Sequence, residues 1–141
     1  MNISDILRYK GSEVVTISPA DTVTTLLTTL ADRNLGALLV VDGGDVVGIV
    51  SERDVVRRLA ERGPGVLDGT VEAIMTADVV SCRSGDSIDS IAETMTQRRV
   101  RHMPVIDDGT LAGIVSIGDV VSSRMRQLEQ DRGQLEQYIT S

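Results

Sequence analysis

Aromatic residues are nearly absent from this chain of 141 residues, which has no Phe, no Trp, and only Tyr9 and Tyr138. Proteins that bind single-stranded nucleic acid commonly stack bases on aromatic side chains, and this chain lacks such a platform. Cations are also scarce, because 21 acidic residues against 14 basic ones give a net charge of −7. A general DNA- or RNA-binding surface needs broad neutralisation of phosphates, so we do not expect nucleic acid as a partner.

Cysteine and histidine occur once each, as Cys82 and His102. A single cysteine forms no internal disulfide, and the chain has no charged-then-apolar leader and no apolar run approaching 18 residues. We therefore expect a cytoplasmic protein without a membrane span. Zinc-type ligand spacing, a Walker loop and Gly-x-Ser-x-Gly are all missing, which predicts neither a metal site nor an enzyme. Metal or redox sensing by Cys82 with His102 is the weakest alternative, because Ile17 is the repeat mate of Cys82 and a small buried hydrophobe is expected there.

What the chain does contain is an internal repeat. Residues 14–59, shifted by 65 positions, align without a gap on residues 79–124. Identical residues occupy 15 of the 46 aligned positions, where unrelated segments would match at roughly three. The most similar block is Gly48–Val56 over Gly113–Val121, in which only the two residues before each Asp differ. The chain is therefore predicted to fold as two pseudo-symmetric halves.

Apolar spacing predicts the same element order, strand-helix-strand-strand-helix, in each copy. Turn residues at 42–45 and 107–109 separate two β-branched runs, which indicates a hairpin. Asp21 and Asp86 precede the first helix of each copy, where either could serve as its N-cap. The expected fold class is therefore α+β.

The repeat and its flanks give five predicted segments. They are an N-terminal segment, a first motif, a linker with a short lead-in helix, a second motif and a helical tail, at residues 1–13, 14–63, 64–77, 78–125 and 126–141. Short amphipathic lead-in segments, Ile3–Leu7 and Val71–Thr76, precede the two copies and look equivalent, although their offset is not 65. The helical pattern of the tail runs to about Tyr138, and the tail is expected either to pack on its own domain or to dock on a second subunit.

Each copy closes with Gly-Ile-Val-Ser-x-x-Asp, at the point where a strand ends and a helix begins. The Ser hydroxyl and the first free N–H groups of the helix face outward there, where an anion or a hydroxyl-rich ligand can bind. The carboxylates of Asp54 and Asp119 can each accept two hydrogen bonds, which suits a ribose diol. The alternative is a plain helix cap. Duplication of the whole block favours the binding interpretation.

A basic cluster, Arg98–His102, precedes the third element of the second copy in an otherwise acidic chain. Its counterpart in the first copy, Arg33–Ala37, keeps one Arg and loses the other cations. The cluster either complements the dipole at a helix C-terminus or clamps a phosphate. In the second case the two ligand sites differ.

Together these features resemble a tandem cystathionine β-synthase (CBS) domain pair, and more narrowly the small stand-alone bacterial CBS-pair proteins. Glu72–Thr76, Arg101–Asp107 and the tail Gln134–Ile139 add to the resemblance, which covers about residues 3–125. It implies two β-α-β-β-α motifs packed as a pair, with a C-terminal helical tail. It also implies adenosine-nucleotide binding in two clefts, each combining the Ser-x-x-Asp of one motif with the first strand of the other.

Carried over by position, the resemblance assigns a set of residues to each cleft. The first cleft would take Ile49, Ser51, Arg53, Asp54, Asp78, Val79, Val80, Val100, Arg101 and His102. The second would take Glu13, Val14, Val15, Leu35, Gly36, Ala37, Ile114, Ser116 and Asp119. Apolar residues would sandwich the adenine, backbone groups would read its edge, and the two aspartates would hold the ribose.

Two positions depart from the family pattern, in which Ser or Thr often precedes the Asp. Arg53 adds a possible phosphate partner in the first motif, and Gly118 removes a hydroxyl in the second. With Arg101 and His102 also assigned to it, the first cleft is expected to bind phosphorylated adenosine better, and the second to be weak or empty.

The sequence thus predicts a non-catalytic regulatory module that senses energy or redox state by binding AMP, ADP or ATP, with NAD(H) as an alternative ligand and no catalytic cofactor. A homodimer, an unidentified target protein and the nucleotide itself are the expected partners, without a membrane. The competing hypothesis is a structural dimerisation or partner-docking module that binds no ligand.

Overall fold

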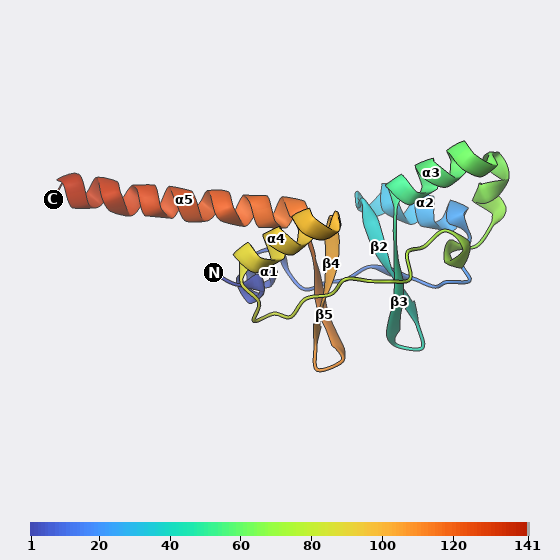
Figure 1. The fold of residues 1–141 in the computed structure, drawn as a ribbon, viewed down its shortest axis with the longest axis horizontal. Helices are drawn as coiled ribbons and strands as arrows, with labels where there is room; N and C mark the ends of the chain where they lie inside the picture. The colour runs from blue at the N-terminus through green and yellow to red at the C-terminus, as the bar shows by residue number, and fades with distance from the viewer. Residues whose placement is uncertain (141) are drawn as a thin grey trace. The chain divides into compact units, whose positions relative to one another are not determined.

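The computed structural model describes residues 1–140, and its contacts divide the chain into two compact units. The first unit comprises Glu13–Val80, and the second comprises Met1–Ser12 with the chain from Ser81 onward (Figure 1). Each unit therefore holds most of one copy of the repeat together with the lead-in segment that precedes the other copy in sequence. The first two residues of the second copy, Val79 and Val80, fall in the first unit. The predicted segment boundaries follow the repeat rather than these contacts and stay predictions, and Ser141 at the end of the predicted tail lies outside the described residues.

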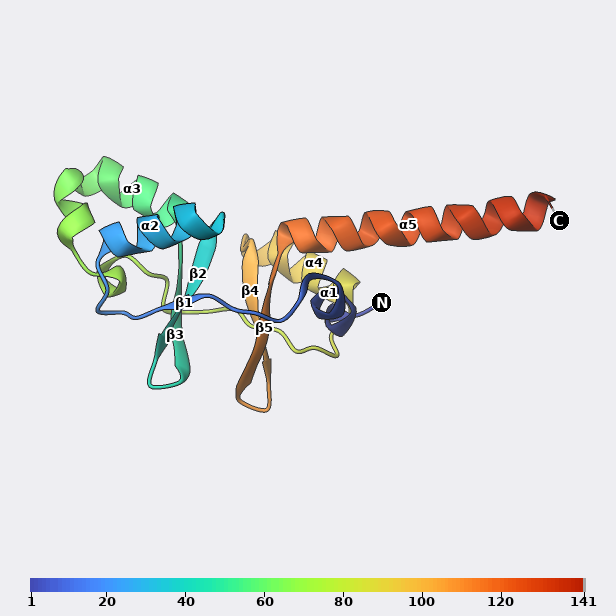
Figure 2. The same ribbon diagram turned by 180° about the vertical axis from the view of Figure 1, so that it is seen from behind.

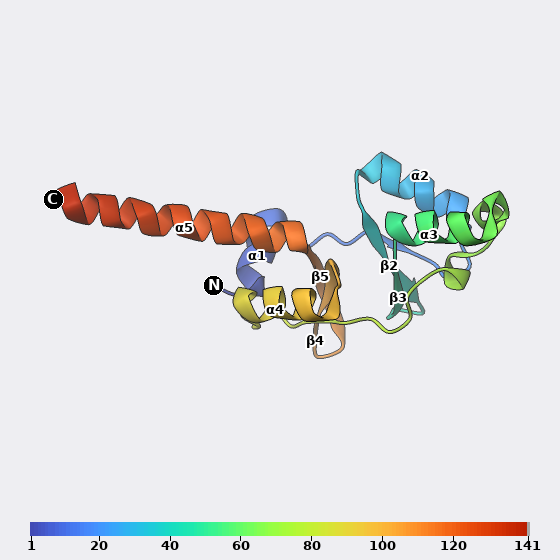
Figure 3. The same cartoon turned by 45° about the horizontal axis from the view of Figure 1, so that its top comes forward.

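The first unit is a three-stranded sheet with two helices. Its elements are β1 (Thr16–Ile17), α2 (Val23–Arg33), β2 (Ala37–Asp42), β3 (Asp45–Ser51), α3 (Glu52–Arg62) and the 3₁₀ turns η1 (Pro64–Asp68) and η2 (Val71–Ala73). The sheet order is β1-β2-β3, with β1 parallel to β2 and β3 antiparallel to it. Helices α2 and α3 run alongside each other, as Figure 3 shows. The mixed α+β class is confirmed in this copy.

The second unit repeats the hairpin and both helices. Its elements are α1 (Ile3–Lys10), α4 (Ile88–Arg98), β4 (His102–Asp107), β5 (Thr110–Ser116) and α5 (Ile117–Thr140). The expected first strand of this copy is reduced to a single parallel bridge between Cys82 and Val105. Helix α5 is continuous through Gly133 and runs on past the rest of its unit (Figure 2). The predicted helical tail is thus one helix with the last element of the second motif.

The two hairpins turn in the predicted places. Gly43 and Gly44 have φ values of 60° and 87°, and Asp108 and Gly109 have φ values of 50° and 79°. Positive φ at both central residues is the type I′ turn, whose twist matches that of the flanking strands.

The predicted N-caps are wrong by one residue. Thr22 caps α2 and Ser87 caps α4, each through a side-chain oxygen that accepts a backbone N–H. Asp21 and Asp86 instead accept the backbone N–H of the third residue before them, so they hold the preceding turn closed. A hydroxyl reaches the N3 amide as well as a carboxylate does, and the sequence offers both side by side.

The lead-in segments close both units in the same way. Ile3 and Ile6 are 0% and 2% exposed, and Val71 and Ile74 are 0% and 3% exposed, so the buried positions correspond at an offset of 68. The core of the first unit gathers buried residues from its three strands, from α2 and α3, and from η2 with the residue after it, while Val66 and Leu67 of η1 pack against this core. The buried residues are Ile17, Val23, Leu26, Leu30, Leu38, Val40, Val50, Val55, Val71 and Ile74. Burial of this apolar stripe stabilises the Thr-rich helix α2 despite its modest intrinsic propensity.

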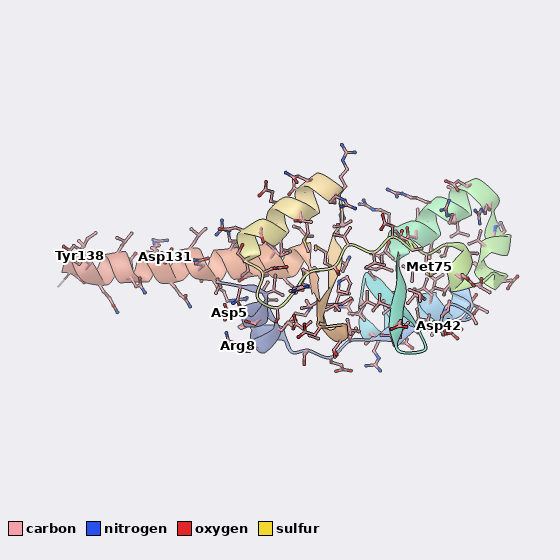
Figure 4. All side chains as sticks on the ribbon, turned by 60° about the horizontal axis from the view of Figure 1, so that its bottom comes forward. Asp5, Arg8, Asp42, Met75, Asp131 and Tyr138 are labelled. Atoms are coloured by element: carbon pink, nitrogen blue, oxygen red, sulfur yellow. The ribbon has the colours of Figure 1, made fainter. Side chains whose placement is uncertain are left out.

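The glycine of each Gly-Ile-Val-Ser block makes room for a lead-in segment. A Cβ on Gly48 would lie 2.6 Å from Met75 Sδ and 3.0 Å from the Thr76 carbonyl oxygen. A Cβ on Gly113 would lie 2.7 Å from Leu7 Cδ2. Met75 is labelled in Figure 4, within the first unit. The glycine is therefore a packing requirement of the motif, and a ligand is not needed to explain it.

Candidate functional site

The first Ser-x-x-Asp lies at the junction of β3 and α3 and forms a reciprocal cap. The Ser51 backbone N–H donates to Asp54 Oδ2 at 2.8 Å, and the Asp54 N–H donates to Ser51 Oγ at 3.3 Å. The Ser51 hydroxyl also lies 3.0 Å from Asp54 Oδ2. Within the described residues, Oδ1 of Asp54 accepts no hydrogen bond. The plain cap is thus present, and it leaves one carboxylate oxygen for a ligand.

The second Ser-x-x-Asp, between β5 and α5, has the same cap and one more partner. The Ser116 N–H donates to Asp119 Oδ2 at 2.8 Å, and the Asp119 N–H donates to Ser116 Oγ at 3.1 Å. Lys10, in the last turn of α1, places its Nζ 2.8 Å from the same Oδ2. Burial alone would raise the pKa of Asp119, but hydrogen bonds from Lys10 and Ser116 outweigh it and hold that pKa below its ordinary value.

Backbone groups of the strand beside each cap are also used differently. Ile49 exchanges two backbone hydrogen bonds with Thr76, each of 2.9 Å. At the equivalent position in the second unit, the Ile114 carbonyl oxygen accepts from Lys10 Nζ at 2.9 Å. A backbone amide thus satisfies this carbonyl in the first unit, and a lysine ammonium satisfies it in the second.

The residues that open each hairpin lie beside the cap of their own unit. Ala37 pairs with Ser51, and the Glu52 N–H donates to the Gly36 carbonyl oxygen at 3.1 Å. In the second unit, His102 pairs with Ser116, and the Ile117 N–H donates to the Arg101 carbonyl oxygen at 2.8 Å. Each unit therefore presents its Ser-x-x-Asp and its hairpin-opening residues at one edge.

The two predicted clefts each draw on both units. Of the first cleft, seven residues belong to the first unit and three to the second: Ile49, Ser51, Arg53, Asp54, Asp78, Val79 and Val80, against Val100, Arg101 and His102. Of the second cleft, three belong to the second unit and six to the first: Ile114, Ser116 and Asp119, against Glu13, Val14, Val15, Leu35, Gly36 and Ala37. Both clefts stay predictions.

The basic cluster begins at the C-terminal end of α4, the location that the helix-dipole interpretation requires. Arg98 is in the last turn of α4, and Arg99 is its C-cap in the left-handed region with φ of 55°. Asn34 is the C-cap at the matching end of α2, with φ of 54°. Cations at this end complement the helix dipole. The side chains of Arg53 and Arg101 are exposed, which leaves them available to a phosphate.

Cys82 is the small buried hydrophobe that its repeat position predicts. It is 4% exposed, with Sγ 3.7 Å from the Pro104 carbonyl oxygen. Burial, helped by the charges of Asp86 and Asp107, raises the pKa of the Cys82 thiol to about 12. The thiol is therefore neutral, and an unreactive structural role follows.

A model of the CBS domain matches the chain twice, at residues 3–61 and 71–126. The chain belongs to the CBS domain family. Both matches begin at a lead-in segment, in agreement with the equivalence of Ile3 and Val71 in the two units of this tandem CBS pair. Among residues 1–140 of this CBS protein, no helix is both long and apolar enough to cross a bilayer.

Other CBS proteins resemble this chain along most of its length. The crystal structure of the CBS-domain containing protein ATU1752 from Agrobacterium tumefaciens is 42% identical, has a TM-score of 0.86, and covers 88% of this chain and 99% of that one. The mitochondrial protein CBSX3 of Arabidopsis thaliana is 32% identical over 97% of this chain and 71% of its own. The CBS domain pair of protein MJ0100 was crystallised with 5′-methylthioadenosine and S-adenosyl-L-methionine. It is 26% identical, with a TM-score of 0.73 over 92% of this chain and 98% of its own.

Lys10 is the site residue that the sequence reasoning missed. It lies ahead of the repeat, so sliding one copy over the other never brings it into register with the Ser-x-x-Asp. The sequence nevertheless carried a signal for a cation at this place. Lys10 stands in the last turn of a helix that ends at Gly11 and whose apolar face must pack on a neighbouring strand.

Proposed function

We propose that this CBS pair is a non-catalytic regulatory module that binds an adenine nucleotide, namely AMP, ADP or ATP, with NAD(H) as the alternative ligand. The observation that carries the proposal is the first Ser-x-x-Asp, where the half-buried Asp54 keeps a carboxylate oxygen without an internal donor among the described residues. The adenosine compounds bound by the CBS pair of MJ0100 support the same ligand class.

The chemistry of the first site suits a ribose 5′-phosphate. Oδ1 of Asp54 can accept the hydroxyls of a ribose diol, while Oδ2 stays in the cap. Arg53, one residue earlier, extends from the N-terminal turn of α3 with an exposed guanidinium that can pair with a phosphate. The positive end of the α3 dipole favours the same negative charge. The residues assigned from elsewhere in the chain would complete the adenine contacts.

Calorimetric titration of AMP, ADP, ATP and NADH into the wild-type chain and the Asp54→Ala variant tests the proposal. A hydrogen bond to a charged group contributes about 1.5–3 kcal/mol, so we expect Asp54→Ala to weaken binding roughly 10- to 100-fold. Asp32→Ala removes an equally charged, exposed carboxylate of the same unit and should leave affinity unchanged.

Loss of a cap costs about 1 kcal/mol, so the melting temperature of each variant is measured alongside, and Asp54→Asn serves as a second variant that keeps an acceptor in the cap. The proposal fails if none of the four nucleotides binds the wild-type chain. The ribose role of Asp54 fails if Asp54→Ala binds with undiminished affinity.

We also propose that the chain forms a homodimer through the exposed face of α5. Apolar residues follow heptad spacing along this helix and are more than half exposed, with Arg132 as the one interruption: Val121, Met125, Leu128, Leu135 and Ile139. Heptad seams are buried when two helices pair. Figure 4 labels Asp131 and Tyr138 on this part of α5. This observation is also what favours the second candidate function, a dimerisation or docking module without a ligand.

Sedimentation of the double variant Leu128→Glu, Leu135→Glu tests the dimer. We expect a monomer, whereas Gln130→Glu with Gln137→Glu adds the same charge elsewhere on α5, off the heptad seam, and should remain dimeric. A wild-type monomer at all concentrations contradicts the proposal.

In that case the unidentified target protein would bind a single chain. A reducing, cytoplasmic compartment belongs to the same proposal, and the single buried cysteine supports it.

A further inference from the structure

The ammonium group of Lys10 holds two acceptors of the second site at once. Its Nζ lies 2.8 Å from Asp119 Oδ2 and 2.9 Å from the Ile114 carbonyl oxygen. The Lys10 and Asp119 side chains are 31% and 22% exposed, so the pair is partly screened from water by the protein. Both acceptors belong to the set that the family resemblance assigns to a nucleoside. The site thus already contains a donor supplied by the chain itself.

Packing of α1 brings Lys10 to this place. Ile3 and Ile6 are buried, and Leu7 lies against Gly113, one residue before Ile114 on β5. The start of the helix is fixed by a capping box of Asn2 and Asp5 and by the bond from the Ile3 N–H to the Asp86 carbonyl oxygen, of 2.9 Å. A helix anchored at its start and along one face carries its last turn to a definite position over the strand. The contact is therefore a product of the fold and is not an accident of one flexible side chain.

The ring of Tyr9 adds a third anchor. The guanidinium of Arg126, on α5, lies 3.8 Å from the centroid of the Tyr9 ring, which ties the last turn of α1 to α5. Asp119 lies on the first turn of the same helix. The lysine and the carboxylate that it binds are thus held on two elements that are themselves joined.

The first site has no such occupant. Thr76 uses its backbone N–H on the Ile49 carbonyl oxygen, and within the described part of the chain Asp54 accepts only from Ser51. Counting from the equivalent positions Leu7 and Met75, the residue that corresponds to Lys10 is Asp78, an acid. An anion at that position has no attraction for Asp54. The two copies of one motif therefore differ in charge where their lead-in segments end.

From this contrast we infer that Lys10 is a built-in occupant of the second Ser-x-x-Asp, holding the Ile114 carbonyl oxygen and the cap oxygen of Asp119, and that it limits each chain to one adenine nucleotide, bound at Asp54. The inference rests on the proposed function. Oδ1 of Asp119, like Oδ1 of Asp54, accepts no hydrogen bond among the described residues, so the block acts where Lys10 binds. A nucleoside group that needs the Ile114 carbonyl oxygen would have to displace the ammonium from a charge-assisted contact. The lowered pKa of Asp119 keeps the carboxylate charged and the contact intact across the neutral range.

Removal of the ammonium should open the second site. Lys10→Met keeps a long apolar stem and has no donor, so α1 can pack as before. In calorimetric titrations with ADP, and in parallel with AMP, ATP and NADH, we expect one nucleotide per wild-type chain and two per Lys10→Met chain. Adding Asp119→Ala to Lys10→Met should return the number to one, while Asp119→Ala alone leaves it at one. Arg8→Met is the matched control, because Arg8 pairs with Asp5 on the same helix, where Figure 4 labels both.

Each other outcome decides against the inference. Two nucleotides per wild-type chain, or one per Lys10→Met chain that melts as the wild type does, overturns it while the proposed function stands. A Lys10→Met chain that binds less than the wild type makes Lys10 a phosphate ligand and also overturns it. If Lys10→Met does not fold, Lys10→Gln, which keeps a neutral polar end, takes its place with the same expectation. Absence of binding in the wild type and in both variants overturns the proposed function together with the inference.

Discussion

The two Ser-x-x-Asp blocks share a cap and differ in what else reaches the aspartate. In both, the serine N–H donates to a carboxylate oxygen at 2.8 Å and the aspartate N–H donates back to the serine hydroxyl. Only Asp119 also receives a lysine. The repeat therefore sets the local geometry of the cap, and segments outside the repeat set its electrostatics. Two sites with nearly the same sequence become chemically different through a residue that lies outside both copies of the repeat.

The lead-in segments explain how this difference arises. Segment α1 has a capping box at its start, basic residues in its last turn and Gly11 as its C-cap, all of which extend a helix to Lys10. Its counterpart η2 lacks a side-chain cap and ends at Ala73, after which the chain is extended enough for Thr76 to pair with Ile49. An equivalent apolar pair is buried in both segments, Ile3 and Ile6 in one and Val71 and Ile74 in the other. The two segments therefore pack alike but differ in helix length.

The largest difference we expect between the units concerns the two motif glycines. Gly48→Ala places a methyl group against Met75 Sδ and also 3.0 Å from the Thr76 carbonyl oxygen, a backbone atom held by its bonds to Ile49. Gly113→Ala meets only atoms of the Leu7 side chain, which can turn away. Overpacking costs roughly 1–3 kcal/mol, so we expect losses of about 2 kcal/mol for Gly48→Ala and about 1 kcal/mol for Gly113→Ala.

Urea denaturation of both variants measures these losses as changes in the free energy of unfolding. Gly109→Ala is not a usable control, because an alanine is strained at its φ of 79°. Gly65→Ala is suitable, since nothing lies within 4 Å of the added Cβ. Equal losses for Gly48→Ala and Gly113→Ala would contradict this difference, because they would show that both lead-in segments move aside equally easily.

Much of the fold could be predicted from the sequence, because its strongest signals are local. Asp-Gly and Gly-Gly between β-branched runs specify the type I′ hairpins, and a stripe such as Val23, Leu26 and Leu30 specifies a helix with one buried face. The Ser-x-x-Asp caps follow from the same local chemistry. The hairpin and both helices of the motif are confirmed in both copies.

Predictions failed where the deciding interaction is not local. The β-branched pairs Val14-Val15 and Val79-Val80 both lie outside the strands. The first copy pairs only Thr16 and Ile17 with its sheet and the second only Cys82, because strand length depends on the neighbour that is available. The contact of Lys10 with Asp119 spans more than a hundred positions and has no counterpart in the other copy. Neither periodicity nor the repeat contains that information.

A smaller difference should appear when the two aspartates lose their charge. Asp119→Asn leaves the Lys10 ammonium without its anion, whereas Asp54→Asn breaks no ion pair among the described residues. Since exposed or half-buried ion pairs contribute about 0.2–1 kcal/mol, we expect Asp119→Asn to lose about 0.5 kcal/mol more free energy of unfolding at pH 6. Added salt should reduce the difference.

The pH dependence of this difference has a definite sign. The folded-state pKa of Asp119 is lowered, so the stability from its contacts is present above the unfolded pKa of about 3.9 and is lost as the pH falls through the folded value. The excess loss of Asp119→Asn over Asp54→Asn, followed by urea denaturation from pH 6 to pH 3, should therefore shrink toward acid. A difference that grows toward acid contradicts the ion pair.

The smallest effect concerns the hairpin turns, where the two units place different residues at a position that requires positive φ. Gly43 and Asp108 occupy the same turn position, with φ of 60° and 50°. Glycine reaches this region without strain but has more freedom to lose on folding, while Asn and Asp tolerate it. Nothing lies within 4 Å of a Cβ on Gly43, so Gly43→Asn should raise the free energy of unfolding by a few tenths of a kcal/mol, roughly 0.4. Asp108→Gly should lower it by a similar amount. Thermal melts of this reciprocal pair that shift in the same direction would show that the turns differ in more than their backbone entropy.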